Sequence, residues 1–403
     1  MIAMSVSAPL STAPDLKFKS YCEDRNFRAE GKSEPNSRSQ TVVYRIHDKQ
    51  WWIKVTLHGT FSSFSCHAEP GQIKSKPERR NEFQDLITMI DFQSQALLDN
   101  TVTELILEEG AKTTAAINVH HEPENNNHLT KLKKSLQFYV REDPLRVFYP
   151  PACQFSTFRA IKVAELIQEY EITDGVFRVL HEGDNKSYVL KVVNRPFYQP
   201  RDSDVIRQEL ENLELFKGVA GIAQPAGIAV LPNPYATDLQ DRNPQMVISG
   251  ILLEYYSGGT LQCALNEQRV KEFSWERWAI QIGNALDTIH RAKKTHMDLK
   301  PSNVVLDDEG NAVLIDISGI GGVTHQWRAP EIRDEICPFD LPFHTRRWND
   351  TWAYGTLLKE LVSQVEGSPF GITLKSIADN LTQDVHTRWT LSEAISQLKI
   401  SLH

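Results

Sequence analysis

The chain has 403 residues, of which 40% are hydrophobic and 24% are charged, and its formal net charge at pH 7 is −8. This length predicts two or three structural units rather than a single core. The negative charge argues against a general nucleic-acid binder, whose affinity depends on an excess of lysine and arginine. No apolar run approaches the roughly 18 residues of a membrane-spanning helix, so we expect no membrane partner.

The cysteines and the first residues indicate the compartment. The five cysteines are far apart and include no C-x-x-C pair, which argues against a disulfide framework or a zinc site. The first residues lack the basic region and apolar stretch of a secretory signal. We therefore expect an intracellular protein, either cytoplasmic or nuclear.

The first part of the chain predicts a tail and a small module. Residues 1–38 are rich in serine, proline and charge, and they predict a mostly disordered tail. Residues 39–157 predict an α+β module of unknown role, with no residue pattern that indicates chemistry. Its expected elements are strands at 41–46 and 51–57, a helix within 81–98, a strand at 101–107 and a helix at 129–140.

Two prolines, Pro150 and Pro151, interrupt ladders and helices and mark a domain boundary, which we place between residues 157 and 158. After it, three strands joined by tight turns predict an antiparallel meander, and a helix from Val205 to Phe216 follows. Beyond Leu261 the pattern is mostly helical. The expected strands are 167–172, 176–181, 187–193, 227–231 and 246–253.

The most specific string of polar residues lies at 296–303. Asp298, Lys300 and Asn303 follow one another on a predicted loop, and Asp316 ends the apolar strand that comes after it. Phosphoryl transfer needs this combination, because the protein must mainly neutralise charge and orient the nucleophile. An acid can take the proton of an acceptor hydroxyl, a lysine can balance phosphate charge, and amide and carboxylate oxygens can hold magnesium.

With these residues the chain resembles the protein-kinase superfamily over residues 158–403. His296 to Asn303 is similar to the H-R-D-x-K-x-x-N loop, Asp316-Ile317-Ser318 stands at the D-F-G position, and Ala329-Pro330-Glu331 matches A-P-E. The resemblance implies a two-lobed α+β fold, with a small antiparallel β lobe at 158–254 and a larger helical lobe at 255–403. It also implies ATP and Mg as cofactors.

The resemblance assigns roles to single residues. It makes Asp298 the catalytic base, Lys300 a phosphate contact, and Asn303 and Asp316 the metal ligands. Upstream, Lys191 matches the third-strand lysine that contacts the α- and β-phosphates. Its helix partner would be Glu209, with Glu211 as the alternative.

The adenine site is implied by the segment 252–261, which resembles the family's hinge. Leu253 would be the gatekeeper residue, and the backbone near Glu254 and Tyr256 would bond the base. Arg388 stands where the family has an arginine that pairs with Glu331. That pair would be structural rather than catalytic.

The sequence also departs from the family pattern. The glycine-rich phosphate loop is missing, and only Gly175 remains between the first two strands of the meander. Fewer backbone N–H groups could then reach phosphates, and we expect weaker nucleotide binding. Ser318 replaces the D-F-G glycine, so a flip of that segment is expected to be restricted.

Regulation by phosphorylation is not expected. Met297 replaces the arginine that binds an activation-loop phosphate in the family, and only the twelve residues 317–328 separate Asp316 from Ala329. Thr324 lies five residues before Ala329, where serine/threonine kinases place a threonine that contacts the catalytic acid and lysine. We therefore expect a serine/threonine kinase that is not controlled by activation-loop phosphorylation.

Two other functions stay open. The missing glycines favour a pseudokinase, a scaffold or binding module whose nucleotide site has decayed. The short activation segment offers little surface for a peptide and would suit a small-molecule acceptor, although we favour a protein substrate. No nucleic-acid partner is expected.

Overall fold

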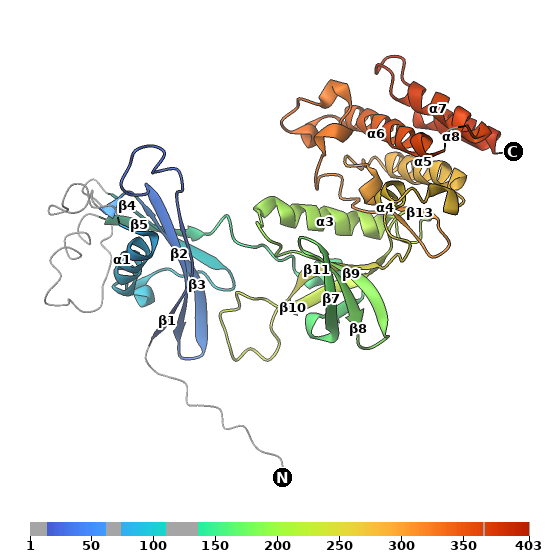
Figure 1. Cartoon of the computed structure of the whole chain (residues 1–403). Coiled ribbons are helices and arrows are strands. Elements are labelled where there is room, and N and C mark those ends of the chain that lie inside the picture. The colour runs from blue at the N-terminus through green and yellow to red at the C-terminus, as the bar shows by residue number, and fades with distance from the viewer. Residues whose placement is uncertain (1–13, 62–73, 110–135, 366, 403) are drawn as a thin grey trace, which may run out of the picture. The chain divides into compact units, whose positions relative to one another are not determined.

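The computed structural model describes residues 14–61, 74–109, 136–365 and 367–402. The chain forms two compact units, and each is described by itself (Figure 1). The first unit comprises residues 1–146 together with 232–245. The second comprises residues 147–231 and 246–403. None of the helices in the described ranges is both long and apolar enough to cross a membrane.

The first unit is a five-stranded sheet in the order β1-β2-β3-β4-β5, and only the β3–β4 pair is parallel. The connection between these two parallel strands contains α1, whose Phe83, Leu86 and Ile87 pack into the core of the unit. Ser75 begins the helix with a capping box, which satisfies its first backbone N–H groups. The elements are β1 (Asp15–Glu23), β2 (Ser37–Ile46), β3 (Lys49–His58), α1 (Lys76–Thr88), β4 (Val102–Glu109) and β5 (Leu136–Glu142).

The prediction of a disordered tail over residues 1–38 is wrong for its second half. Residues Asp15–Glu23 form β1, which pairs antiparallel with β2, and Leu16, Phe18 and Tyr21 pack against the core. Only one face of this edge strand is covered, so three apolar residues among lysines and serines are enough to hold it. Residues 1–13 lie outside the described part of the chain.

The last strand of this unit also differs from the prediction. We expected a helix at 129–140, but β5 begins at Leu136 and pairs antiparallel with β4. A ladder partner elsewhere in the chain therefore overrides the local helical pattern. The rest of that predicted helix, 129–135, lies outside the described residues.

The predicted domain boundary needs a correction of its own. The first unit ends at Arg146, but it also contains residues 232–245, which connect two strands of the second unit. We call residues 232–245 the excursion. In this excursion Thr237 O accepts a hydrogen bond from Gln50 N at 2.8 Å, and Asn100 N donates to the Thr237 hydroxyl at 2.9 Å. Tyr235 packs edge-on against Trp52. The excursion therefore completes the first unit although it is distant in sequence.

The second unit begins with a six-stranded sheet in the order β6-β10-β11-β9-β8-β7. The predicted meander is present as β7, β8 and β9, and α3 packs against β11. These elements are β6 (Ala160–Lys162), β7 (Leu166–Thr173), β8 (Val176–His181), β9 (Lys186–Val192), α3 (Pro200–Leu215), β10 (Pro225–Pro232) and β11 (Met246–Glu254).

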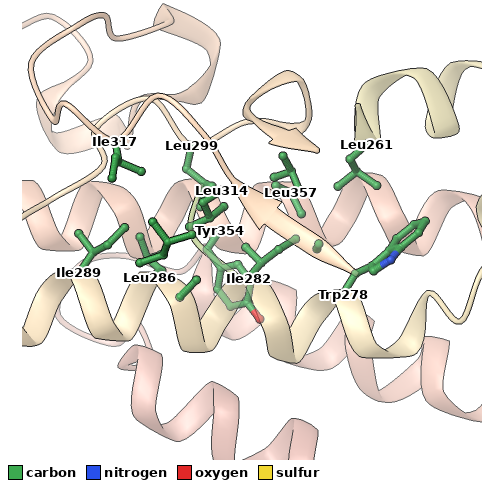
Figure 2. Close-up of a cluster of buried hydrophobic side chains, with 14 of the residues drawn as sticks. Leu261, Trp278, Ile282, Leu286, Ile289, Leu299, Leu314, Ile317, Tyr354 and Leu357 are labelled. Atoms are coloured by element: carbon green, nitrogen blue, oxygen red, sulfur yellow. The ribbon is translucent and has the colours of Figure 1, made fainter. Parts of the chain in front are cut away.

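A helical lobe with one short hairpin follows, which confirms the predicted two-lobed α+β fold. Its core brings Trp278 and Ile282 together with Tyr354 and Leu357, and Leu299, Leu314 and Ile317 lie over them (Figure 2). The buried Tyr354 hydroxyl donates to Ala279 O at 2.6 Å. The elements are α4 (Leu261–Asn266), α5 (Glu276–Arg291), β12 (Val304–Leu306), β13 (Ala312–Leu314), α6 (Phe343–Gln364), α7 (Pro369–Leu381) and α8 (Leu391–Ser401).

Candidate active site

The loop that carries Asp298 is held by a fully buried carboxylate on α6. Asp350 accepts hydrogen bonds from the backbone N–H groups of His296 at 2.8 Å and Met297 at 2.7 Å, and its Oδ2 lies 3.0 Å from His290 Nε2. Met297 has a φ of 68°, a left-handed conformation that a non-glycine residue adopts at a cost. Charged hydrogen bonds of this kind offset that cost and fix the loop.

Asp298 lies at the centre of a closed hydrogen-bond network. Lys300 Nζ contacts Asp298 Oδ2 at 2.7 Å and donates to the Thr324 hydroxyl at 2.8 Å. Thr324 returns two hydrogen bonds to Asp298 Oδ1, from its backbone N at 2.9 Å and its hydroxyl at 2.8 Å. The Asn303 amide donates to Asp298 O at 2.8 Å and to Oδ2 at 3.1 Å. The carboxylate is therefore fixed in one orientation.

A second group of charges meets at Lys191 on β9. Its ammonium contacts Glu209 of α3 at 2.6 Å and also bonds to Asp316, which follows β13 with a φ of 60°. Burial alone would lower the pKa of Lys191, but the charges of Asp316 and Glu209 outweigh it and leave this pKa raised. Glu209 is thus the helix partner, whereas Glu211 is exposed and bonds to Gln208.

The two carboxylates on Lys191 differ electrostatically. Burial raises the pKa of Glu209, and Lys191 offsets this only in part. Burial acts in the same direction on Asp316, but the charge of Lys191 outweighs it and holds the pKa of Asp316 below its ordinary value. Asp316 is therefore the better candidate for a ligand that must be ionised.

One cavity of about 310 Å³ joins these groups. Gly175, Lys191, Glu209, Asp298 and Asp316 all line it. Lys300 and Asn303 do not, and they reach the site through their bonds to Asp298. The structure therefore brings five of the predicted residues around one space.

The predicted hinge residues lie apart from this cavity lining. Leu253 is buried in the core, and the backbone N–H of Glu254 donates to Gln224 O at 3.0 Å. The Tyr256 hydroxyl accepts a hydrogen bond from Gln224 N, also at 3.0 Å. Gln224 thus occupies one backbone group at the hinge and fixes the segment 254–256.

The oxygen donors near Asp316 fit magnesium. The side-chain NH₂ of Asn303 donates to Asp298, so the side-chain oxygen Oδ1 is the atom left for a ligand. The backbone carbonyl of Asn303 accepts a hydrogen bond from Ile315 N at 3.1 Å, which fixes this residue next to the strand that leads to Asp316. Asp316 bonds to Lys191 through one carboxylate oxygen. Among the described residues no cluster of three or more His, Cys, Asp or Glu side chains could hold a metal. Magnesium commonly binds one or two protein oxygens plus substrate phosphates, which fits this donor set.

Two features of the activation segment were missed by sequence reasoning. Buried Asn212 of α3 donates to Ile317 O at 2.7 Å and, at 3.4 Å, to Ser318 O. Ser318 caps the next turn by accepting hydrogen bonds from Ile320 N at 3.3 Å and Gly321 N at 2.9 Å. The only sequence signal for Asn212 is a polar residue one turn after Glu209, on the same helix face.

The region around Met297 is apolar. Met297 is 1% exposed and forms a buried cluster with Ala329 and Ile332. Farther along the segment, Glu331 and buried Arg388 form a two-point ion pair, with N–O distances of 2.6 and 3.0 Å. Apolar packing and this ion pair therefore hold the end of the segment.

Comparisons with known proteins agree with this geometry. The family model described as protein kinase domain matches residues 173–399. The chain is 26% identical over 215 residues to serine/threonine-protein kinase Nek6 of Oryza sativa subsp. japonica, which covers 49% of this chain and 37% of that protein. It is 27% identical over 241 residues to mitogen-activated protein kinase kinase kinase 11 of Homo sapiens, covering 53% and 25%.

A third relative, eIF-2-alpha kinase GCN2 of Homo sapiens, is 24% identical over 189 residues, which is 45% of this chain and 11% of that protein. The chain thus spans less than half of the length of each of these relatives. Because the family model covers more than half of this chain, and its motifs fold into one connected site, the chain belongs to the protein kinase family.

Proposed function

We propose that this chain is a kinase that transfers the γ-phosphoryl group of ATP to a serine or threonine hydroxyl of a protein. The network of Asp298, Lys300 and Thr324 carries the proposal, because it fixes an acid that lines the same cavity as Lys191 and Asp316 and places a cation beside that acid. A pure scaffold has no need of this alignment.

Each side chain then has a role in the transfer. Asp298 accepts the proton of the acceptor hydroxyl. At the same time the hydroxyl oxygen bonds to the γ-phosphorus, and the bond between this phosphorus and the leaving oxygen of ADP breaks. Lys300 lies 2.7 Å from Asp298 and balances charge on the moving phosphoryl group. Lys191 contacts the α- and β-phosphates. Asn303 and Asp316 would hold magnesium, which neutralises phosphate charge when it is bound with ATP.

We further propose that activity does not depend on phosphorylation of residues 317–328. Met297 offers no charge to a phosphate and is buried among Ala329 and Ile332. Asn212 holds the start of the segment through two backbone carbonyls. Contacts inside the chain thus supply the order that a phosphate would otherwise provide.

A pseudokinase is the second candidate, and the turn at Asp174 and Gly175 favours it. The Gly175 N–H donates to Glu171 Oε1 at 3.1 Å, so it is occupied within the protein. A thermal-shift titration with Mg-ATP separates the two functions. An active kinase should be stabilised as ATP rises above its Kd, and Asp316→Ala should abolish the shift. No shift with any nucleotide would leave the scaffold function.

The acceptor needs a second assay. Incubation with labelled ATP and generic protein acceptors should label protein, and Asp298→Asn should stop the labelling. Labelling that persists in Asp298→Asn would contradict the role of this acid. ATP turnover without protein labelling would point to a small-molecule acceptor.

A further inference from the structure

The turn between β7 and β8 lies beside the end of β9, where it continues the antiparallel ladder of β8 and β9. Gly175 O accepts a hydrogen bond from Val192 N at 2.9 Å, and Gly175 N is taken by Glu171. A Cβ placed on Gly175 would lie 2.6 Å from Arg195 Cβ, and the φ of Gly175 is 72°. The turn therefore packs against Arg195, and both backbone polar groups of Gly175 are already used.

The cavity beside this turn is rich in acids. Its lining includes five carboxylates but only two permanently charged cations, Lys191 and Arg195. Glu209 and Asp316 both bond to Lys191. A polyphosphate that enters this cavity therefore meets Arg195 as the cation that has fewer partners.

Arg195 is held in a defined place yet keeps donors free. Its backbone N donates to Val193 O at 3.1 Å, and its O accepts from Tyr198 N at 3.2 Å. Its guanidinium donates to Asp202 Oδ1 through Nη2, and its side chain is 47% exposed. Asp202 Oδ2 also accepts from Gln199 N at 2.8 Å, which anchors it at the start of α3. A guanidinium has five N–H donors, so this pairing leaves several for a ligand.

We propose that Arg195 binds the terminal phosphates of the nucleotide and replaces the backbone amides of a glycine-rich loop. The inference rests on the proposed nucleotide-dependent function. Guanidinium groups match phosphate oxygens in a two-point geometry, so one arginine can substitute for several weaker N–H contacts. Arg195 is thus a specificity residue for nucleotides with a β- and γ-phosphate.

The test measures the Kd of Mg-ATP and of AMP on the full chain by calorimetric titration. Arg195→Ala should weaken ATP binding by about tenfold or more and leave AMP binding within about twofold. Arg195→Lys should retain part of the affinity. The matched control is Arg207→Ala, because Arg207 lies on α3, is exposed, pairs with Asp204 and does not line the cavity. It should bind ATP like the wild type.

A second variant separates phosphate binding from support of α3. Asp202→Asn breaks the ion pair but keeps Arg195, so ATP should bind at least as tightly as to the wild type. The inference is overturned if Asp202→Asn weakens ATP binding as much as Arg195→Ala does. It is also overturned if Arg195→Ala weakens the binding of ATP and AMP equally, or weakens the binding of neither. A wild-type chain that binds no nucleotide would overturn the proposed kinase function as well, whereas the other outcomes leave that function standing.

Discussion

The apolar site around Met297 predicts what happens when an arginine is restored there. In Met297→Arg a guanidinium would enter a cluster of Ala329 and Ile332 in which Met297 is 1% exposed. Trp352 packs against this cluster, and its ring already makes a cation–π contact with the Arg333 guanidinium, which lies 5.7 Å from the ring centroid. The new charge would thus be buried among apolar side chains, and Asp350, which accepts a hydrogen bond from Met297 N, already bonds to His290 and His296 as well.

The size of the effect follows from this burial. Loss of a packed methionine costs about 2–5 kcal/mol. A buried charge without a free partner adds to the low end of that range, so we expect a loss of about 3 kcal/mol or more. In a domain of 150–250 residues this lowers Tm by roughly 6–12 °C. Scanning calorimetry measures the shift, and Met297→Leu should lose less than about 1.5 kcal/mol as the matched control.

One result would refute the reasoning behind this prediction. If Met297→Arg were as stable as the wild type and gained activity upon phosphorylation of residues 317–328, the segment would not be held by apolar packing. A fall in stability with equal activity of wild-type protein before and after phosphatase treatment is the expected outcome.

Two further variants test the support of the site. Asn212→Asp keeps the size of the side chain but places an acceptor against the carbonyls of Ile317 and Ser318, so kcat at saturating ATP should fall about tenfold. An unchanged kcat would show that Asn212 does not position Asp316, and Asn212→Gln should restore part of the activity. Glu331→Gln leaves buried Arg388 without its charged partner and should lower the free energy of unfolding by about 3 kcal/mol in a urea titration. A loss below about 1 kcal/mol would mean that solvent already screens this pair.

The residues of the site were predictable where local spacing decides their position. Glu209 and Glu211 both precede Leu213, but residues two positions apart on a helix point in directions about 200° apart around its axis. Only Glu209 faces β9 and Lys191, as its apolar neighbours Leu210 and Leu213 indicate. The fold could likewise be predicted, because short apolar runs are separated by tight turns at Asp174-Gly175 and Gly183-Asp184-Asn185.

Other features depend on partners far away in the chain, and no local pattern marks them. Asn212 acts on carbonyls more than 100 residues later, at Ile317 and Ser318. The hydrogen-bond partners of the excursion at 232–245 are Asp48, Gln50 and Asn100, which lie more than 130 residues earlier. In the sequence alone, the excursion therefore looks like an ordinary loop. Sequence reasoning finds such residues only if the tertiary arrangement is known.

The excursion at 232–245 also imposes an order on folding during protein synthesis. Domains usually fold as units from the N-terminus while the chain is made. Here the first unit lacks the partners of Gln50 and Asn100 until Thr237 has been made, by which time β6 to β10 of the second unit exist. The hairpin of β2 and β3 can pair at once, whereas the bond from Gln50 to Ala236 O joins residues 186 positions apart. A high separation of contacts slows folding, so the excursion is expected to join the first unit late, after the core of that unit, built from residues 16–140, has formed.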